Sequence, residues 1–109
     1  MISEEQIQHY RDHGFVVLEN FLSPTELSGA RQEIEAFIPG WLDYAADPSG
    51  PKPAKWDEAA RSRRNVRFPF KGSQLNAITL HPELRRFASL MAGGGEIFCE
   101  QSDLTYKCK

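Results

Sequence analysis

The chain has 109 residues, of which 40 % are hydrophobic and 26 % charged, and its net charge at pH 7 is −2. These values are ordinary for a globular protein and argue against wholesale disorder. The small net charge gives no global electrostatic reason to expect binding to nucleic acid or to an acidic membrane, and no run approaches the roughly 18 apolar residues of a membrane span. The polar, acidic N-terminus is unlike a secretory signal. We therefore expect a cytoplasmic protein with a single domain over residues 1–109.

The first part of the chain combines a helix start, a helix stop and a short apolar run. Ser3 and Gln6 have the spacing of a capping box, which predicts a helix that begins after Ser3. Gly14 is suited to the left-handed residue that ends such a helix, with Phe15 placed to fold back on Tyr10. The apolar run Phe15–Leu18 is bounded by turn residues and predicts a short strand covered on both faces.

A second helix is predicted directly after this run. Ser23 and Glu26 repeat the capping box, and Pro24 occupies the first helical position. Pro39 and Gly40 end the helical pattern. The composition of residues 43–53 then predicts an exposed loop. The apolar positions with helical spacing are Leu27, Ala30, Ile34, Phe37 and Ile38.

The second half of the chain predicts further helices and then an extended segment. Leu75–Leu80 is consistent with a short helix or turn, and Pro82 opens another helix that Gly93–Gly95 terminate. From Glu96 onward, polar and apolar residues alternate as in a strand. On one face of that strand we expect Ile97, Cys99, Gln101, Asp103, Thr105 and Lys107.

Several of these segments resemble the phytanoyl-CoA dioxygenase family of non-haem iron, 2-oxoglutarate-dependent oxygenases. The resemblance rests on YRDHGF followed by VVLENFLSP, on NVRFPF (65–70), on LHPEL (80–84) and on QSDLTYK (101–107), all in the family's order. It implies an α+β fold, in which N-terminal helices pack on the first strands of a double-stranded β-helix of the jelly-roll or cupin type. It also implies Fe(II) and 2-oxoglutarate as cofactors and a small molecule as substrate.

The resemblance further implies where the iron is bound. The family binds it with a His-x-Asp pair and a distant His, a facial triad with open positions, and the pair follows soon after a Tyr-Lys strand end. This sequence stops two residues after Lys107. We therefore expect the N-terminal part of such an enzyme, inactive alone and completed by a C-terminal segment or a second chain. Gln101 and Lys107 are the predicted cosubstrate-binding residues. The alternative is a non-catalytic interaction module derived from the fold.

Around residues 41–56 the resemblance leaves two interpretations open. The region between the second helix and the barrel often helps to cover the active site in the resembling enzymes, so Trp41, Tyr44 and Trp56 can belong to a lid. Aromatic side chains usually bury area first, however. The simpler interpretation is that these three residues fix the loop against the helix.

Some histidines formally match metal sites. His81-Pro82-Glu83 has the His-x-carboxylate spacing, but Pro82 predicts a helix start there, with Glu83 in the first turn, so we interpret this sequence as a cap. His9 and His13 are four apart on the first helix, a spacing that suits a metal ion if both rings face the same way. The simpler role for His13 is contact with the last carbonyl groups of its helix.

A basic cluster spans Arg61 to Arg67 and is followed by Lys71. Interleaved arginine and phenylalanine residues can bind single-stranded nucleic acid or a substrate anion. A solvated face with local ion pairs is the third reading, and the acidic balance of the chain argues against nucleic acid.

Overall fold

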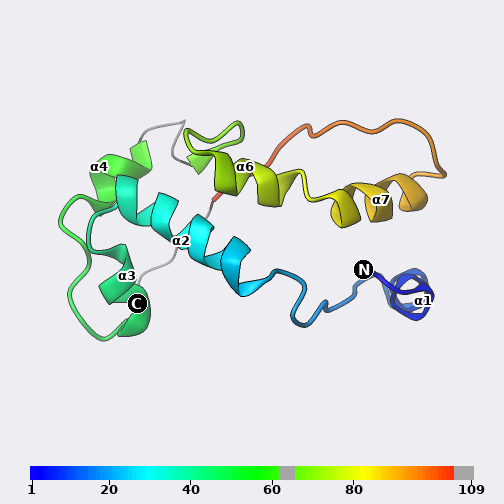
Figure 1. Ribbon diagram of the computed structural model, residues 1–109, viewed down its shortest axis with the longest axis horizontal. Coiled ribbons are helices and arrows are strands. Elements are labelled where there is room, and N and C mark those ends of the chain that lie inside the picture. The colour runs from blue at the N-terminus through cyan, green and yellow to red at the C-terminus, as the bar shows by residue number, and fades with distance from the viewer. Residues whose placement is uncertain (62–65, 105–109) are drawn as a thin grey trace.

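The computed structural model describes residues 1–61 and 66–104, apart from the side chain of residue 60. The helices in these ranges are arranged along an elongated body, with α1 at one end and α3 and α4 at the other (Figure 1). None of them is long enough and apolar enough to cross a membrane. They are α1 (Glu4–His13), α2 (Pro24–Phe37), α3 (Trp41–Ala46), α4 (Trp56–Arg61), α6 (Ser73–Thr79) and α7 (Pro82–Met91).

The predicted ends of α1 are confirmed. The Ser3 hydroxyl accepts the Gln6 backbone N–H, and the Gln6 side chain accepts the Ser3 N–H, which completes the capping box. Gly14 ends the helix in the left-handed conformation at φ 81°, and its N–H donates to the Tyr10 carbonyl at 2.7 Å. A residue with a Cβ is strained in this conformation, so glycine is the fitting choice.

The predicted start of α2 is confirmed in the same way. The Ser23 hydroxyl accepts the Glu26 N–H, and the Glu26 carboxylate accepts the Ser23 N–H. Hydrogen bonding to the Glu26 carboxylate, chiefly from the Ser23 backbone N–H, lowers the pKa of Glu26. Two orphan donors at the helix N-terminus are thereby satisfied.

The main hydrophobic core lies between α2, α3 and α4. Tyr44 and Trp56, from either side of the loop that joins α3 to α4, are both buried, and their rings meet edge to face with centroids 5.5 Å apart. This geometry is typical of favourable aromatic pairs, and it supports the interpretation that these aromatics fix the loop against the helix. The buried members of the core are Ile34, Ile38, Tyr44, Trp56 and Ala59.

The short helix α3 was not predicted, and its start depends on a side chain from α2. The Glu35 carboxylate accepts the backbone N–H groups of Gly40 and Leu42, each at 2.8 Å. These hydrogen bonds, led by that from Leu42, lower the pKa of Glu35. Because Gly40 has no side chain to cap the helix, a carboxylate from the preceding helix takes that role.

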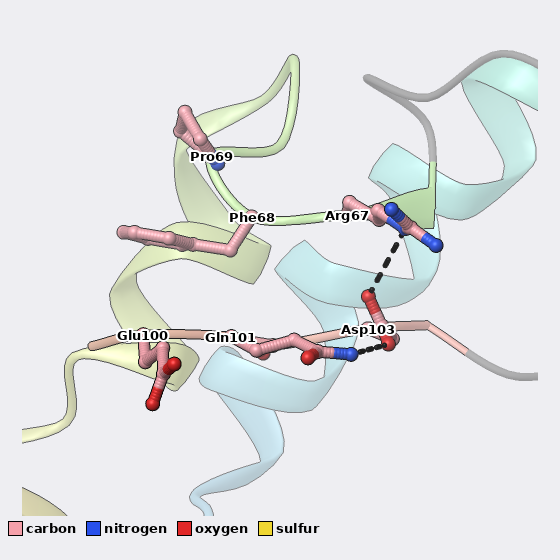
Figure 2. A pocket seen from close by; sticks show the side chains of 7 residues that line it. Arg67, Phe68, Pro69, Glu100, Gln101 and Asp103 are labelled. Carbon is pink, nitrogen blue, oxygen red and sulfur yellow. Dashed lines mark hydrogen bonds and ion pairs between the residues drawn. The ribbon is translucent and has the colours of Figure 1, made fainter.

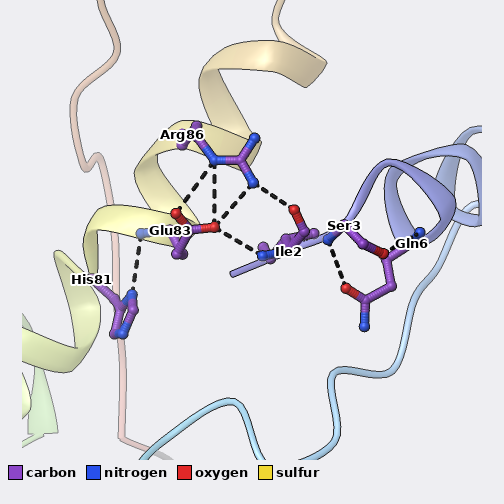
Figure 3. A network of polar contacts seen from close by, with 6 residues as sticks. All are labelled: Ile2, Ser3, Gln6, His81, Glu83 and Arg86. Atoms are coloured by element: carbon purple, nitrogen blue, oxygen red, sulfur yellow. Dashed lines mark hydrogen bonds and ion pairs between the residues drawn. The ribbon is translucent and has the colours of Figure 1, made fainter.

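At the other end of the molecule, α1 is attached to α7 through the backbone of Ile2 (Figure 3). The Ile2 N–H donates to the Glu83 carboxylate at 2.9 Å, and Arg86 donates to the Ile2 carbonyl at 2.6 Å. Tyr10 of α1 packs edge to face on Phe87 of α7, with ring centroids 5.0 Å apart. The first and last described helices therefore lie together.

The expected strands are not formed in the described residues. Phe15–Leu18 has no regular secondary structure and pairs with no described segment, and Phe15 and Val17 are 57 % and 69 % exposed, so the prediction of a covered strand is wrong for this structure. In the alternating C-terminal segment, the β contact is one isolated antiparallel bridge, between Arg67 and Asp103. A strand needs a neighbouring strand to pair with its backbone groups. Neither Phe15–Leu18 nor the C-terminal segment has a partner of sufficient length among the described residues. The regular secondary structure of residues 1–61 and 66–104 is therefore helical apart from this bridge, and the packing of helices on a double-stranded β-helix is not confirmed in them.

Candidate functional site

The bridge between Arg67 and Asp103 joins the two segments that line an open cleft (Figure 2). The Phe68 N–H donates to the Ser102 carbonyl, and the Leu104 N–H donates to the Val66 carbonyl, each at 2.8 Å. These bonds bring the C-terminal extended segment back to the turn that precedes α6. The cleft has a volume of about 490 Å³ and is lined by Arg67, Phe68, Pro69, Glu100, Gln101, Ser102 and Asp103.

Asp103 contacts both Arg67 and Gln101 in this cleft. Its carboxylate lies 3.6 Å from the Arg67 Nε and accepts the Gln101 amide Nε2 at 2.7 Å (Figure 2). The Arg67 and Asp103 side chains are 52 % and 35 % exposed, so water screens the pair strongly. The cleft lining carries two carboxylates, Glu100 and Asp103, against the single guanidinium of Arg67, and Asp103 already engages both donors that an entering carboxylate would use.

Asn76 of α6 fixes the turn that directly follows the cleft residue Pro69. Its side chain accepts the Phe70 N–H at 2.7 Å and donates to the carbonyls of Phe70 and Gly72. The Phe70 side chain is buried. A further contact joins Thr79 of α6 to Ser102, whose hydroxyl oxygens are 3.2 Å apart. Contacts from α6 therefore fix both segments that line the cleft.

A more apolar groove adjoins the cleft and shares Phe68 with it. Its volume of about 550 Å³ falls in the range of small-molecule sites. The Phe98 side chain at its edge is 88 % exposed. The groove lies between α6, α7 and the returning segment, and its lining residues are Phe68, Thr79, Leu80, Leu84, Arg85, Ala88, Ile97, Phe98 and Cys99.

His81 caps α7, as predicted, and Glu83 lies in the first turn of that helix with its carboxylate directed away from the His81 ring. The His81 Nδ1 accepts the Glu83 backbone N–H at 3.2 Å, which caps α7, while its Nε2 lies 3.5 Å from the Glu26 carboxylate. The Glu83 carboxylate turns toward Arg86 and Ile2 (Figure 3). Hydrogen bonding from Arg86, followed by that from the Ile2 backbone, lowers the pKa of Glu83.

The other predicted site residues are placed as follows. Gln101 lies at the surface of the cleft, and Lys107 lies outside the described residues, so their role in cosubstrate binding stays a prediction. Arg61 and Lys71 are exposed, and Arg63 and Arg64 are also outside the described ranges. Arg67 forms an ion pair with Asp103 and its side chain is 52 % exposed, which agrees with the interpretation of a solvated face but not with its expectation of local partners. No sequence pattern pointed to this pairing, because the two residues are far apart along the chain.

An iron site of the facial-triad type requires its ligands to be grouped around one point. Within residues 1–61 and 66–104, no three His, Cys, Asp or Glu side chains are grouped so that they could hold a metal ion. A facial triad needs two histidines and a carboxylate around one point. The described residues therefore do not fit the iron site, and no chemical step can be assigned to them through it.

Comparison with known proteins identifies the lineage of the chain. The model of the phytanoyl-CoA dioxygenase (PhyH) family matches residues 10–102, which include the helix end at Gly14, the NVRFPF sequence, α7 and the cleft residues up to Ser102. The same comparisons found no match among curated proteins and none among solved structures. Because the match spans most of its length, the chain belongs to the phytanoyl-CoA dioxygenase family.

Proposed function

We propose that this chain supplies the N-terminal helical layer and part of the cosubstrate pocket of a dioxygenase that hydroxylates a small molecule. The observation that carries the proposal is the family match over residues 10–102, because the PhyH family is generally dependent on Fe(II) and 2-oxoglutarate. In that chemistry 2-oxoglutarate and O₂ are converted to succinate and CO₂ as one oxygen atom enters a substrate C–H bond.

Within the proposal, Gln101 and Lys107 bind the carboxylates of 2-oxoglutarate. The position of Gln101 on an open cleft beside Arg67 supports this role, since amide and guanidinium N–H groups are donors to carboxylates. Asp103 accepts one N–H of the Gln101 amide at 2.7 Å, so the second N–H of that amide is the donor that a bound carboxylate would use. Lys107 lies on the same predicted face, four residues after Asp103, and adds a positive charge there.

The iron ligands come, in this proposal, from a further segment or from a second chain. The two segments expected to form strands favour such completion. Their backbone groups are largely unpaired within the described ranges, and an unpaired extended edge is a template for an added strand. Phe15, Val17 and Phe98 are exposed apolar side chains on these segments, which an added sheet would cover. By itself the chain then does not turn over.

The second candidate function is a non-catalytic interaction module derived from the same fold. The same exposed apolar side chains support it, because a partner chain would remove their apolar area from water. The two functions differ in what the complete native product does with 2-oxoglutarate.

The first experiment is the intact mass of the native product together with its reading frame beyond Lys109. That product, purified without oxygen, is then supplied with Fe(II), 2-oxoglutarate and O₂, and succinate is measured. We expect Fe(II)-dependent succinate release, with Gln101→Leu and Lys107→Met each raising the KM for 2-oxoglutarate by about tenfold, the equivalent of one lost hydrogen bond to a charged group. Gln32→Leu and Lys55→Met are matched controls away from the cleft. If the native product releases no succinate, the oxygenase proposal fails and the interaction module is the candidate function that remains.

A further inference from the structure

A pair of histidine rings lies exposed on α1, at the opposite end of the molecule from the main core. His9 and His13 are one helical turn apart, so they share a face. Their ring centroids are 4.3 Å apart and their planes are inclined by 19°. Both residues are exposed. The condition that the sequence left open, that both rings face the same way, is therefore met.

The hydrogen bonds of the two rings leave nitrogen lone pairs available. The His13 Nδ1 lies 3.1 Å from the His9 carbonyl oxygen. A carbonyl only accepts, so in the neutral ring the proton is assigned to Nδ1 and the Nε2 keeps its lone pair. This contact also confirms the predicted role of His13 at the helix end. The His9 ring has no hydrogen-bond partner among the described residues, and the Phe15 ring meets it edge-on at 5.3 Å.

We propose that His9 and His13 together bind a divalent ion of the late first transition row, with Cu²⁺ bound most tightly. Neutral imidazole is the commonest protein ligand for such ions, and affinity rises from Fe²⁺ to Cu²⁺ and falls again at Zn²⁺. In the stacked arrangement the in-plane lone pairs of the two rings do not converge, so metal binding requires rotation of the exposed rings, which the broad ring torsion of histidine allows.

The site has two protein ligands, and water fills the other positions. No third His, Cys, Asp or Glu in the described ranges completes a group with them. The adjacent Asp12 carboxylate is turned to the Gln8 amide, 2.8 Å away. With Fe²⁺ low in the affinity order, this site is independent of the iron of the proposed function. Binding links the last two turns of α1 and stabilises that helix.

The test is calorimetric titration of the full chain, without an affinity tag, with Cu²⁺ alone. Cys99→Ser and Cys108→Ser are introduced first, since thiols bind copper. We expect His9→Gln and His13→Gln each to weaken binding by at least about tenfold, as loss of one of two ligands implies. Electron paramagnetic resonance should show two nitrogen ligands in the parent and fewer in each variant. His81→Gln should leave the affinity unchanged.

A control of identical composition tests the spacing. Arg11→His combined with His13→Arg places the imidazoles two residues apart, on nearly opposite sides of the helix, and should weaken binding as much as His13→Gln. Equal affinity in all variants means an adventitious ion only and overturns the proposal, as does a parent spectrum with a single nitrogen ligand. Amide exchange guards against a variant that loses α1: Cu²⁺ must slow exchange across α1 in the parent, and unchanged exchange also overturns the proposal.

Discussion

The carboxylate of Glu33 on α2 accepts the backbone N–H of Leu75 at 2.9 Å and so joins α2 to the first turn of α6. It also accepts the N–H of Gln74. The N-cap residue of α6 is Gly72, which offers no side-chain cap. A carboxylate from another helix therefore satisfies two of the donors that every helix leaves unpaired at its start. One side chain both caps α6 and fixes how α2 and α6 pack.

Replacement of Glu33 by glutamine should weaken this joint. The amide has one oxygen in place of two and presents N–H groups to backbone donors, so at least one hydrogen bond is lost. We expect the free energy of unfolding to fall by about 1 kcal/mol, the usual size of a lost cap. Urea denaturation followed by circular dichroism measures the change. Glu19→Gln, in an exposed turn, is the matched control, and an equal loss in both variants would contradict the assignment.

Gly72→Ala should disturb the same joint from the other side. A Cβ at Gly72 would lie 2.4 Å from the Glu33 Cδ, closer than real contacts allow. The Glu33 carboxylate must move away and lose its hydrogen bonds to α6. We expect destabilisation in the parent and a smaller effect in a Glu33→Ala background, where the colliding atoms are absent. Equal effects of Gly72→Ala in both backgrounds, measured by urea denaturation, would show that the clash is relieved elsewhere.

The contact between Glu83, Arg86 and Ile2 should be lost at acid pH. Hydrogen bonding from Arg86 holds the pKa of Glu83 below its ordinary value of 4.5. A lowered folded-state pKa contributes stability above the unfolded-state pKa, and that contribution disappears as the pH falls through the folded-state pKa. We therefore expect Glu83→Gln to lower the Tm at neutral pH, with the difference from the parent shrinking below pH 4.5. Glu96→Gln serves as control, and a pH-independent difference would contradict this account.

Local signals explain which elements the sequence predicted well. Ser3, Gly14, Ser23 and Pro82 act within one or two turns of their own position, and each starts or ends a helix where its chemistry requires. The cap of α6 could not be predicted in this way, because Glu33 lies 41 and 42 residues away from the groups it caps. The cap of α3 comes from Glu35, five and seven residues away, at a spacing that is not that of the capping box. Capping residues next to a helix end thus predict where that helix begins or ends, whereas a cap supplied by another helix depends on how the helices pack.

The strands and the cleft illustrate the same limit. Phe15–Leu18 has a strand-like composition, but strand formation depends on a partner that composition does not reveal. Phe15 was expected to fold back on Tyr10, yet its ring lies against His9 while Tyr10 packs on Phe87. Gln101 and Asp103 were placed on one face by alternation, and their hydrogen bond agrees with this. Their neighbour Arg67 enters through a long-range bridge that periodicity cannot predict.

Ile38 should be among the most sensitive positions of the main core. Its side chain is 1 % exposed and lies in the cluster with Tyr44 and Trp56. Removal of one methylene by Ile38→Val leaves a small cavity and should cost about 0.5 to 1.5 kcal/mol. Ile97→Val is the same change at a partly exposed position and should cost less. Thermal and urea unfolding of the two variants give the comparison, and a larger loss for Ile97→Val would place the core elsewhere.

Two phenylalanines at opposite extremes of burial offer the clearest test of the C-terminal segment. Phe70 is 5 % exposed and Phe98 is 88 % exposed. Phe70→Ser removes a buried ring and should destabilise the chain by about 3 to 5 kcal/mol, whereas an exposed substitution should change stability by less than about 0.5 kcal/mol. Both variants are compared by urea denaturation at several protein concentrations. A large, concentration-dependent loss for Phe98→Ser would mean that another copy of the chain covers this ring, because stability that depends on association varies with protein concentration. A large loss at every concentration would mean that the segment folds back over its own groove.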